Sequence, residues 1–333
     1  MTTPPVMPAG VPREPLVSRF APAPTGFLHL GHVVNALYVW GVTKAMGGRV
    51  LLRIEDHDRQ RCRPEFERAI LDDLDWLGFE PDDYVTAAFR AGPCAGRQND
   101  RAAIYASALG VLEAAGIVYA CRCSRGDIET ASPDRQTGGT EPAYPGRCRD
   151  ARLARVPGCG IRVQIFEGVE RFHDLRHGVQ TERPASHCGD VLIRNRRGDW
   201  TYQFAVAVDD WDQGVTLVIR GDDLLASTGR QLQIARHLGR SRAPVFLHHP
   251  LLMKTRAQKL SKSDEATAIR DLRAAGLPRE AVIGRAAAAA GLAHRANETD
   301  RATPDGDARP LSVAEACDLV RCAGNWTYPE ERL

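Results

Sequence analysis

Two histidines lie where a predicted loop enters a predicted helix, and their spacing indicates a phosphate site. The segment RFAPAPTGFLHLGH (19–32) places His29 and His32 three residues apart, with Gly31 directly before the second. In a helix this spacing puts both imidazoles on one face at the N-terminus, where backbone N–H groups and the helix dipole favour anions. Gly31 lets a planar base or a phosphate approach the backbone. Donors held there stabilise the charge that develops as pyrophosphate leaves, although two histidines that only cap a helix would have the same spacing.

The few lysines gather in one segment. The 44 basic residues comprise 40 arginines and 4 lysines, and three of the lysines, Lys254, Lys259 and Lys262, fall within nine residues. An ammonium group is a compact point charge that suits phosphates, a task in which arginine does not replace it. Lys259 and Lys262 can close over the β- and γ-phosphates of a nucleotide, and Lys262 is predicted to stabilise the transition state of adenylation. Chance clustering in an arginine-rich chain is the alternative.

Three cysteines indicate a metal site. Cys121, Cys123 and Cys148 flank a loop at 132–146 that is rich in Pro, Gly, Thr and Ser and has little apolar content. Such a loop gains order from a structural Zn²⁺ held by thiolates. The residues alone leave the fourth ligand open, with Cys159 and His173 as candidates, and three cysteines can also be bystanders. Since the total of nine cysteines is odd, a disulfide framework is not expected.

The composition is that of an ordinary folded chain. A length of 333 residues, with 43% apolar and 26% charged residues, predicts two domains with a linker or small insert. The formal net charge of +2 leaves a nucleic-acid partner only through a local patch. The chain has no apolar run long enough for a membrane span, and its first sixteen residues lack the features of a signal peptide. We therefore expect a cytoplasmic protein without a membrane partner.

The order of predicted elements favours an α/β fold. A β-type run at 16–20, a helix at 28–46 and a buried strand at 49–55 predict a right-handed βαβ unit. Alternating or apolar runs later resume the strand pattern, and the last part of the chain is mostly helical. The remaining predictions are helices at 64–78, 99–115, 228–238, 265–275, 279–290 and 313–322, a strand at 117–121, strand-like runs at 161–166, 190–194, 201–210 and 215–221, and a polar linker at 297–309.

Four motifs in this order resemble the class I glutamyl-tRNA synthetases. They are RFAPAPTGFLHLGH at 19–32, LRIEDHD at 52–58, VTLVIRGDD at 215–223 and KLSKS at 259–263. The last of them coincides with the family's second nucleotide signature, so the resemblance converges with the lysine cluster. It implies a Rossmann-like catalytic domain that activates glutamate with ATP and Mg²⁺ and passes it to a tRNA.

The length suggests one branch of that family. Lys262 is followed by 71 of the 333 residues, too few for the large helical anticodon-binding region of a full synthetase. The chain therefore resembles the shortened paralogues that attach glutamate to the queuosine base in the anticodon of tRNA(Asp), with the anticodon stem-loop as partner and a monomer as the expected state. This resemblance implies a disordered tail at 1–16, a first catalytic half at 17–116, an inserted zinc-binding acceptor subdomain at 117–189, a second catalytic half with the KLSKS loop at 190–264, and a helical stem-contact domain at 265–333.

The same resemblance implies the residues that hold the substrate and the metal. Glutamate carries two carboxylates and one ammonium, which call for two arginines and one acid. Arg220 would grip a carboxylate bidentately, Glu55 would receive the ammonium and Tyr202 would hydrogen-bond the amino acid. In the first motif the family usually has serine where this chain has Ala23, which leaves only a backbone contact there. The implied glutamate set is Arg19, Ala21, Ala23, Glu55, Tyr202 and Arg220, the implied ATP set is His29, Gly31, His32, Lys259 and Lys262, and the implied zinc set is Cys121, Cys123, Tyr144 and Cys148.

Two other hypotheses stay open. A compact glutamyl-tRNA synthetase would charge the 3′ end of a tRNA with the same adenylate. A catalytically silent tRNA-binding or regulatory module could share the fold, because a fold does not fix a function. The intact His29, His32, Lys259 and Lys262 argue against the silent module.

Overall fold

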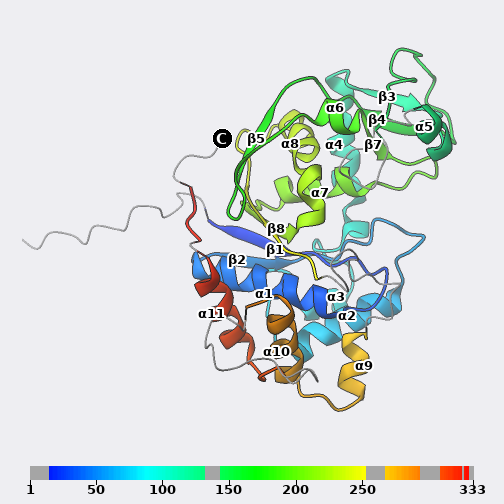
Figure 1. The fold of residues 1–333 in the computed structure, drawn as a ribbon. Helices are drawn as coiled ribbons and strands as arrows, with labels where there is room; N and C mark the ends of the chain where they lie inside the picture. Colours follow the sequence, from blue (N-terminus) through cyan, green and yellow to red (C-terminus); the bar gives the residue numbers. More distant parts are fainter. Residues whose placement is uncertain (1–14, 132–142, 253–266, 293–307, 325, 330–333) are drawn as a thin grey trace, which may run out of the picture.

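The computed structural model describes residues 15–131, 143–252, 267–292, 308–324 and 326–329, and it has an α/β architecture (Figure 1). Its strands are β1 (Val17–Phe20), β2 (Arg49–Leu52), β3 (Val118–Cys121), β4 (Gly160–Val163), β5 (Glu170–Asp174), β6 (Gly178–Glu182), β7 (Val191–Arg194), β8 (Leu217–Gly221) and β9 (Val245–His249). Its α-helices are α1 (Leu30–Ala45), α2 (Pro64–Leu77), α3 (Thr86–Ala91), α4 (Ala102–Ala114), α5 (Arg125–Ala131), α6 (Pro184–Cys188), α7 (Tyr202–Asp212), α8 (Thr228–His237), α9 (Ile269–Ala274), α10 (Arg279–Ala289) and α11 (Val313–Ala323). Two 3₁₀ helices, η1 (Gln98–Arg101) and η2 (Asp222–Ser227), complete the described elements.

The chain opens with the predicted βαβ unit. β1 and β2 pair in parallel, from Val17 opposite Arg49 to Phe20 opposite Leu52, and α1 connects them. Every residue of β1 is buried, as is every residue of β2 after Arg49. Burial on both faces is the expected environment of parallel strands.

A second sheet continues this unit across the molecule. Its strand order is β6-β5-β9-β8, in which β5, β9 and β8 run parallel and β6 is antiparallel to β5. The two sheets meet where the backbone N–H of Thr216 donates to the carbonyl of Val17 at 2.9 Å. The carboxyl ends of β1, β2, β8 and β9 therefore open on the same side, which is where open α/β sheets bind their ligands.

The helices at the end of the chain support the βαβ unit. α10 and α11 pack against α1, and α9 and α10 contact α2 (Figure 1). Gly41 of α1 allows the close approach, because a Cβ at this position would lie 2.9 Å from Cβ of Val320. Apolar side chains of α10 and α11 belong to the same core cluster as those of β1, α1 and β2.

A smaller antiparallel unit interrupts the second sheet in sequence, because β3 and β4 precede β5 and β6 whereas β7 follows them. β4 pairs with both β3 and β7, and this unit lies with α5 at the upper right of Figure 1. Val163 and Ile193 from its strands share a buried cluster with Tyr105 of α4 and Phe204 of α7. The inserted unit therefore packs on α4 and α7, next to the carboxyl edge of the sheets.

Most predicted elements are confirmed to within a few residues, including the helices at 28–46, 64–78, 228–238 and 279–290. The strand-like interpretation of 201–210 is wrong, because this segment forms α7. Residues 204–210 are all buried, so no polar face marks a helical period, and such a run cannot be told from a buried strand by pattern alone. The sequence did not predict β5, β6 and β9. None of the described helices has the length and apolar character needed to cross a membrane.

Candidate active site

A cavity of about 660 Å³ opens at the carboxyl ends of β1, β2, β8 and β9. Its wall combines the loop after β1, the start of α1, the segment after β2, the start of α7 and the ends of β8 and β9. The described residues that were predicted to bind glutamate or ATP all line it, namely Arg19, Ala21, Ala23, His29, Gly31, His32, Glu55, Tyr202 and Arg220. The fold thus brings together residues that are far apart in the chain. For example, Nη1 of Arg19 donates to the carbonyl of Ile219 at 3.0 Å.

The two histidines cap α1 and also line the cavity. Nδ1 of His29 accepts from the N–H of Gly31 at 3.1 Å, and Nδ1 of His32 accepts from the N–H of His29 at 3.1 Å. Because each Nδ1 is an acceptor, each neutral ring carries its proton on Nε2 and can donate there. Capping is therefore part of their role, and it orients the rings. It also explains Gly31, since a Cβ there would lie 2.9 Å from Cε1 of His29.

Arg19 is anchored on one side and open on the other. Its Nε donates to Oδ1 of Asp210 at 3.0 Å, and its Nη1 donates to the carbonyl of Ile219. Among the described residues nothing accepts from Nη2 or from the second N–H of Nη1, so this edge offers two parallel donors to a ligand. Burial opposes ionisation of Asp210, but Arg19 and Arg53 lower the pKa of this carboxyl to about 2.

Glu55 supplies the negative group of the cavity. Its Oε1 accepts from Nε and Nη2 of Arg53 at 3.3 and 3.2 Å, and no described residue donates to Oε2. Burial raises the pKa of this carboxyl above its ordinary value, while Arg53 and Arg19 act in the opposite direction. The fully buried Arg53 therefore holds one oxygen of Glu55 and leaves the other for a cationic ligand.

Arg220 is held by neutral groups. Its Nε donates to Nε2 of His248 at 3.0 Å and its Nη1 to Oε1 of Gln231 at 2.7 Å. Its Nη2 donates to Oγ1 of Thr228 at 2.9 Å and to the carbonyl of Leu224 at 3.3 Å. The hydroxyl of Tyr202 is a further neutral partner of this guanidinium, so a ligand would share the last N–H of Nη1 with it. The bidentate grip predicted for Arg220 is not supported by this geometry, and Arg19 has the open edge that such a grip requires.

Tyr202 lines this cavity and a neighbouring one. Burial raises the pKa of its phenol, so Tyr202 is a neutral hydroxyl at the boundary between the two. The neighbouring cavity has a volume of about 320 Å³ and separates the start of α7 from the cysteine cluster. Its wall includes Tyr202, Gln203 and Arg230 on one side and Cys123, Tyr144 and Arg162 on the other.

The predicted lysines Lys259 and Lys262 lie outside the described residues, as does Lys254. Leu251 and Leu252, the last described residues before them, line the main cavity.

The three predicted cysteines form one cluster. The Sγ atoms of Cys121, Cys123 and Cys148 all lie within 4.8 Å of one another, and those of Cys123 and Cys148 are 3.6 Å apart. The hydroxyl of Tyr144 lies 3.5 Å from Sγ of Cys121 and 3.8 Å from Sγ of Cys123. Neither of the other candidates, Cys159 or His173, belongs to this described cluster. Three thiols and a phenol thus converge as four donors, which fits a tetrahedral metal.

The surroundings of the cluster hold its ligands in place. Burial opposes ionisation of Cys148, but backbone and hydroxyl hydrogen bonds lower the pKa of this thiol to about 7. Nε of Arg162 donates to Sγ of Cys121 at 3.3 Å, and the guanidinium stacks 3.7 Å from the ring centre of Tyr144. The positive charge of Arg162 beside the sulfur of Cys121 favours the thiolate. Gly189, which has a φ of 62°, packs on Tyr144, because a Cβ added to this glycine would lie 2.0 Å from the carbonyl of Tyr144.

Several residues that shape the site were not predicted. Arg53 belongs to the second motif and Asp210 ends the apolar run at 201–210, but nothing in their spacing shows that they meet at 2.8 Å. Nδ1 of His248 lies 2.6 Å from Oδ2 of Asp174, so a carboxylate on an unpredicted strand fixes the ring that holds Arg220. In the sequence, the pair His248–His249 at the end of an apolar run was the one feature that could have indicated a strand ending at the site.

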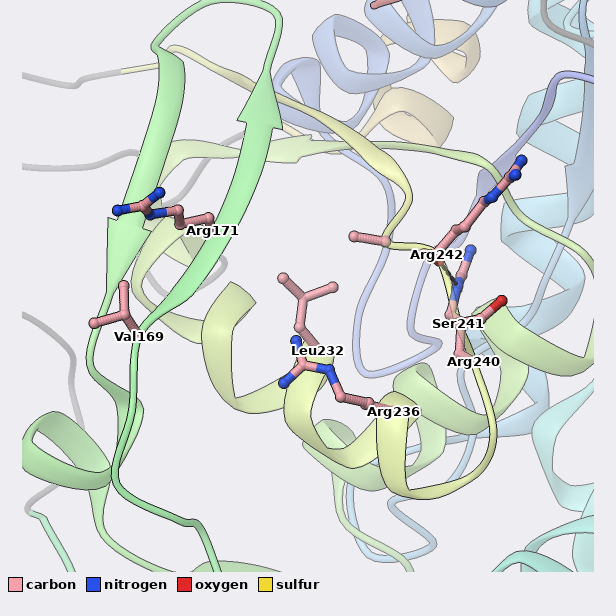
Figure 2. Close-up of a pocket in the computed structure, with 8 residues that line it drawn as sticks. Val169, Arg171, Leu232, Arg236, Arg240, Ser241 and Arg242 are labelled. Atoms are coloured by element: carbon pink, nitrogen blue, oxygen red, sulfur yellow. Dashed lines mark hydrogen bonds between the residues drawn. The ribbon is translucent and has the colours of Figure 1, made fainter. Parts of the chain in front are cut away.

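A further hollow of about 420 Å³ lies between β5, α8 and the segment before β9 (Figure 2). Four arginines line it, but Arg236 is paired with Glu170 and Arg240 donates to backbone carbonyls. Figure 2 shows that Arg242 extends away from Arg171 and Arg236. These guanidinium groups do not converge on one point, so this hollow is not the candidate active site.

Comparison with known proteins gives the class of the chain. Residues 15–298 match the model of the class I tRNA synthetases (E and Q), catalytic domain, and the chain belongs to this family. A crystal structure of a glutamate tRNA ligase from Elizabethkingia meningosepticum, in complex with its amino acid, superposes with a TM-score of 0.70 at 26% identity, covering 92% of this chain and 66% of that one. Glutamate–tRNA ligase 1 of Acidithiobacillus ferrooxidans is 40% identical over 80% of this chain, which spans 55% of that relative's length.

Other relatives match over nearly their whole length. The glutamyl-Q tRNA(Asp) synthetase of Nitratidesulfovibrio vulgaris is 38% identical over 82% of this chain and 86% of its own length. That of Pseudomonas aeruginosa strain PAO1 is 38% identical over 95% of this chain and 98% of its own. Within the class, the chain therefore falls in the glutamyl-Q tRNA(Asp) synthetase family.

Proposed function

We propose that this protein activates L-glutamate with ATP to glutamyl-adenylate and transfers the glutamyl group to the queuosine base in the anticodon of tRNA(Asp). The observation that carries the proposal is the main cavity, where Arg19, Arg220 and Glu55 meet beside His29 and His32. Two cationic groups and one anionic group complement the two carboxylates and the ammonium of glutamate. The direct test is ATP–pyrophosphate exchange, which should require glutamate and proceed without tRNA.

In this proposal each charged group of the cavity has one task. The open edge of Arg19 binds one carboxylate through two hydrogen bonds, and the remaining N–H of Arg220 binds the other. Oε2 of Glu55 accepts from the substrate ammonium, and the hydroxyl of Tyr202 adds a neutral hydrogen bond. Ala21 and Ala23 present no polar side chain, so they leave room for the amino acid and act through their backbone.

The start of α1 is the proposed phosphate site. Gly31 leaves room for an anion there, and the dipole of α1 favours it. His29 and His32 add Nε2 donors that stay in place during the reaction, and fixed donors stabilise developing charge best. ATP would enter as its Mg²⁺ complex.

We expect the substitution Lys262→Ala to lower the rate of glutamate-dependent exchange by about 10²-fold or more, the scale for loss of one preorganised donor to the transition state. This assignment rests on the sequence motif. Lys44→Ala is the control, because Lys44 makes a surface ion pair with Asp82 at 2.7 Å. Near-normal exchange by the Lys262 variant would dismiss the assignment.

The neighbouring cavity is the proposed entrance for the nucleoside that receives glutamate. It shares Tyr202 with the glutamate site, so an occupant would lie next to the activated carboxyl group. Tyr144 and Tyr202 offer aromatic surface and Arg230 and Gln203 offer polar groups, a combination that suits a base held out of its stack. We propose that a monomer acts in this way on the anticodon stem-loop in the cytoplasm, where the stem also meets the C-terminal helices.

The cysteine cluster is proposed to hold one structural Zn²⁺ through Cys121, Cys123, Cys148 and Tyr144. Its role would be to order the segment that forms one wall of the neighbouring cavity. No chemical step passes through the metal.

Elemental analysis should find about one zinc per chain, since four converging donors hold a single ion. Cys121→Ser should lose the metal and lower the melting temperature, because an alcohol is a poor replacement for a thiolate ligand. Cys188→Ser is the matched control, as this thiol also lines the neighbouring cavity but bonds to the carbonyl of Pro184 at 3.1 Å. A metal-free preparation with full activity would show that the cysteines are bystanders.

A further inference from the structure

Arg220 is a buried cation without an anionic partner among the described residues. Its side chain is 4% exposed, and every group that accepts from it is neutral. His248 is neutral because burial and the charge of Arg220 lower the pKa of this imidazole to about 4. A buried guanidinium whose hydrogen-bond partners are all neutral has no compensating charge, so it attracts an anionic ligand strongly, because the surroundings screen the charge poorly.

The hydrogen bonds around Arg220 leave no freedom in the orientation of Gln231. A guanidinium only donates, so the group 2.7 Å from Nη1 must be the amide oxygen of Gln231. The amide nitrogen of Gln231 then donates to Oε1 of Gln203 at 2.7 Å, and Nε2 of Gln203 donates to Oγ of Ser227 at 3.1 Å. Arg220 therefore sets the direction of a chain of hydrogen bonds that passes through Gln203 in the wall of the neighbouring cavity and ends at Ser227.

Four of the acids near Arg220 lie behind other groups, and Glu55, which lines the same cavity, is held by Arg53. Asp174 is separated from it by the ring of His248, and Asp210 is paired with Arg19 and Arg53. Glu182 accepts from the backbone N–H of Gly229 at 2.8 Å, and Asp222 pairs with Arg176 and His177. Each of these carboxylates already has its own donors, and none forms an ion pair with Arg220.

We propose that Gln231 is a positioning residue that determines specificity for glutamate, because it fixes Arg220 with a neutral acceptor and so leaves the charge of Arg220 for the side-chain carboxylate of the substrate, the group that glutamine replaces by an amide. This inference rests on the proposed glutamate site. Gln231 is 7% exposed and reaches the substrate only through Arg220. A carboxylate at the same position would satisfy the same N–H group but would also neutralise the guanidinium. The advantage of the anionic substrate over its neutral amide, glutamine, would then disappear.

The experiment compares Gln231→Glu with Gln231→Met and with the control Gln233→Glu. The first replacement keeps size and acceptor but adds a charge, and the second removes the acceptor without adding charge. Gln233 lies on the same helix, is also buried, and bonds to the backbone of Phe166 rather than to Arg220. Glutamate and glutamine are titrated in ATP–pyrophosphate exchange, glutamate binding is measured by calorimetry, and thermal melting reports folding.

For Gln231→Glu we expect the KM and Kd of glutamate to rise by about 30-fold or more, the lower range for losing a buried charge partner, with a smaller change in kcat. The preference for glutamate over glutamine should fall by a similar factor, whereas Gln231→Met should raise KM and keep that preference. Gln233→Glu should lower the melting temperature, because its buried carboxylate would face the carbonyl of Phe166; in the folded protein both measures should stay within about threefold of the parent, since Gln233 does not contact Arg220.

Unchanged KM and unchanged selectivity in a folded Gln231→Glu variant would overturn the inference. So would an equal loss in Gln231→Met and Gln231→Glu, because that pattern indicates packing and not charge. Failure of the proposed function is distinct, since the parent protein itself would then neither bind glutamate nor support exchange.

Discussion

Replacement of Arg19 by Met is expected to lower kcat/KM for glutamate in ATP–pyrophosphate exchange by about 10³-fold, a loss of roughly 4 kcal/mol, which lies within the range for removing one partner of a buried charge pair. The reason is the open edge of Arg19, which carries the unused donors of Nη1 and Nη2 into the cavity. The protein should remain folded. Asp210, which loses one donor, keeps Nη2 of Arg53 at 2.8 Å.

Two companion variants make this result specific. Arg19→Lys keeps a positive charge but not the planar pair of donors, so its activity should lie between those of the parent and the Met variant. Arg61→Met is the matched control, because Arg61 also lines the cavity but is paired with Asp58 and has a side chain that is 74% exposed. A comparable loss in the Arg61 variant, or a mild effect in a folded Arg19→Met protein, would contradict the proposed role of the open edge.

The motifs predicted the location of the site because each combines local structure with chemistry. His29, Gly31 and His32 lie at a helix start whose geometry is set by neighbouring residues. The loop after β1, the start of α1 and the ends of β2 and β8 must meet once the parallel sheet forms. Nine residues that line the main cavity were therefore predicted from the sequence, whereas others, such as Asn35, Arg61, Leu224 and His249, were not.

The partners that orient these residues could not be predicted in the same way. Arg53 and Asp210 are 157 positions apart, and His248 and Asp174 are 74 positions apart. Such pairs depend on the order of strands in the sheet, and β5 and β9 were not predicted. Which of the two arginines can offer two parallel donors could not be predicted for the same reason, since it depends on which N–H groups the fold has already used.

For the proposed metal site, the sequence could indicate the three cysteines but could not identify the fourth ligand. The cysteines were evident from their spacing, but the fourth donor depends on which oxygen, sulfur or nitrogen reaches the cluster in space. Cys159 and His173 were as good as Tyr144 by composition. Only the fold separates them, by turning the chain at Gly189 so that Tyr144 packs inward.

The largest expected effect concerns the acceptor of the glutamyl group. Labelled glutamate should be transferred to tRNA(Asp) that contains queuosine and should not be transferred to the same tRNA with guanine in its place. The physical reason is the cyclopentene diol of queuosine. Its two adjacent hydroxyls resemble those of a terminal ribose, so one of them can attack the carbonyl carbon of an adenylate held beside Tyr202, with AMP as the leaving group.

The 3′ end of the tRNA needs its own control, because a terminal ribose offers the same pair of hydroxyls. Removing the last adenosine does not exclude transfer to the 3′ end, since the newly exposed nucleotide also has a ribose diol. A 3′-phosphate on the trimmed tRNA blocks one of these hydroxyls and so prevents transfer there. Transfer to queuosine-containing tRNA(Asp) should survive both treatments. If trimming and blocking the 3′ end abolish transfer while guanine in place of queuosine is tolerated, the protein charges the acceptor end of the tRNA. That activity is the one named for the glutamate–tRNA ligase to which the chain is 40% identical.

Both acceptors would react with the same adenylate, so an exchange assay cannot distinguish them. A substitution in the neighbouring cavity can, because the proposal places the queuosine base there. Gln203→Ala changes the wall of that cavity and also removes the group that accepts from Gln231. It should therefore raise the KM of glutamate modestly and weaken transfer to queuosine by a larger factor.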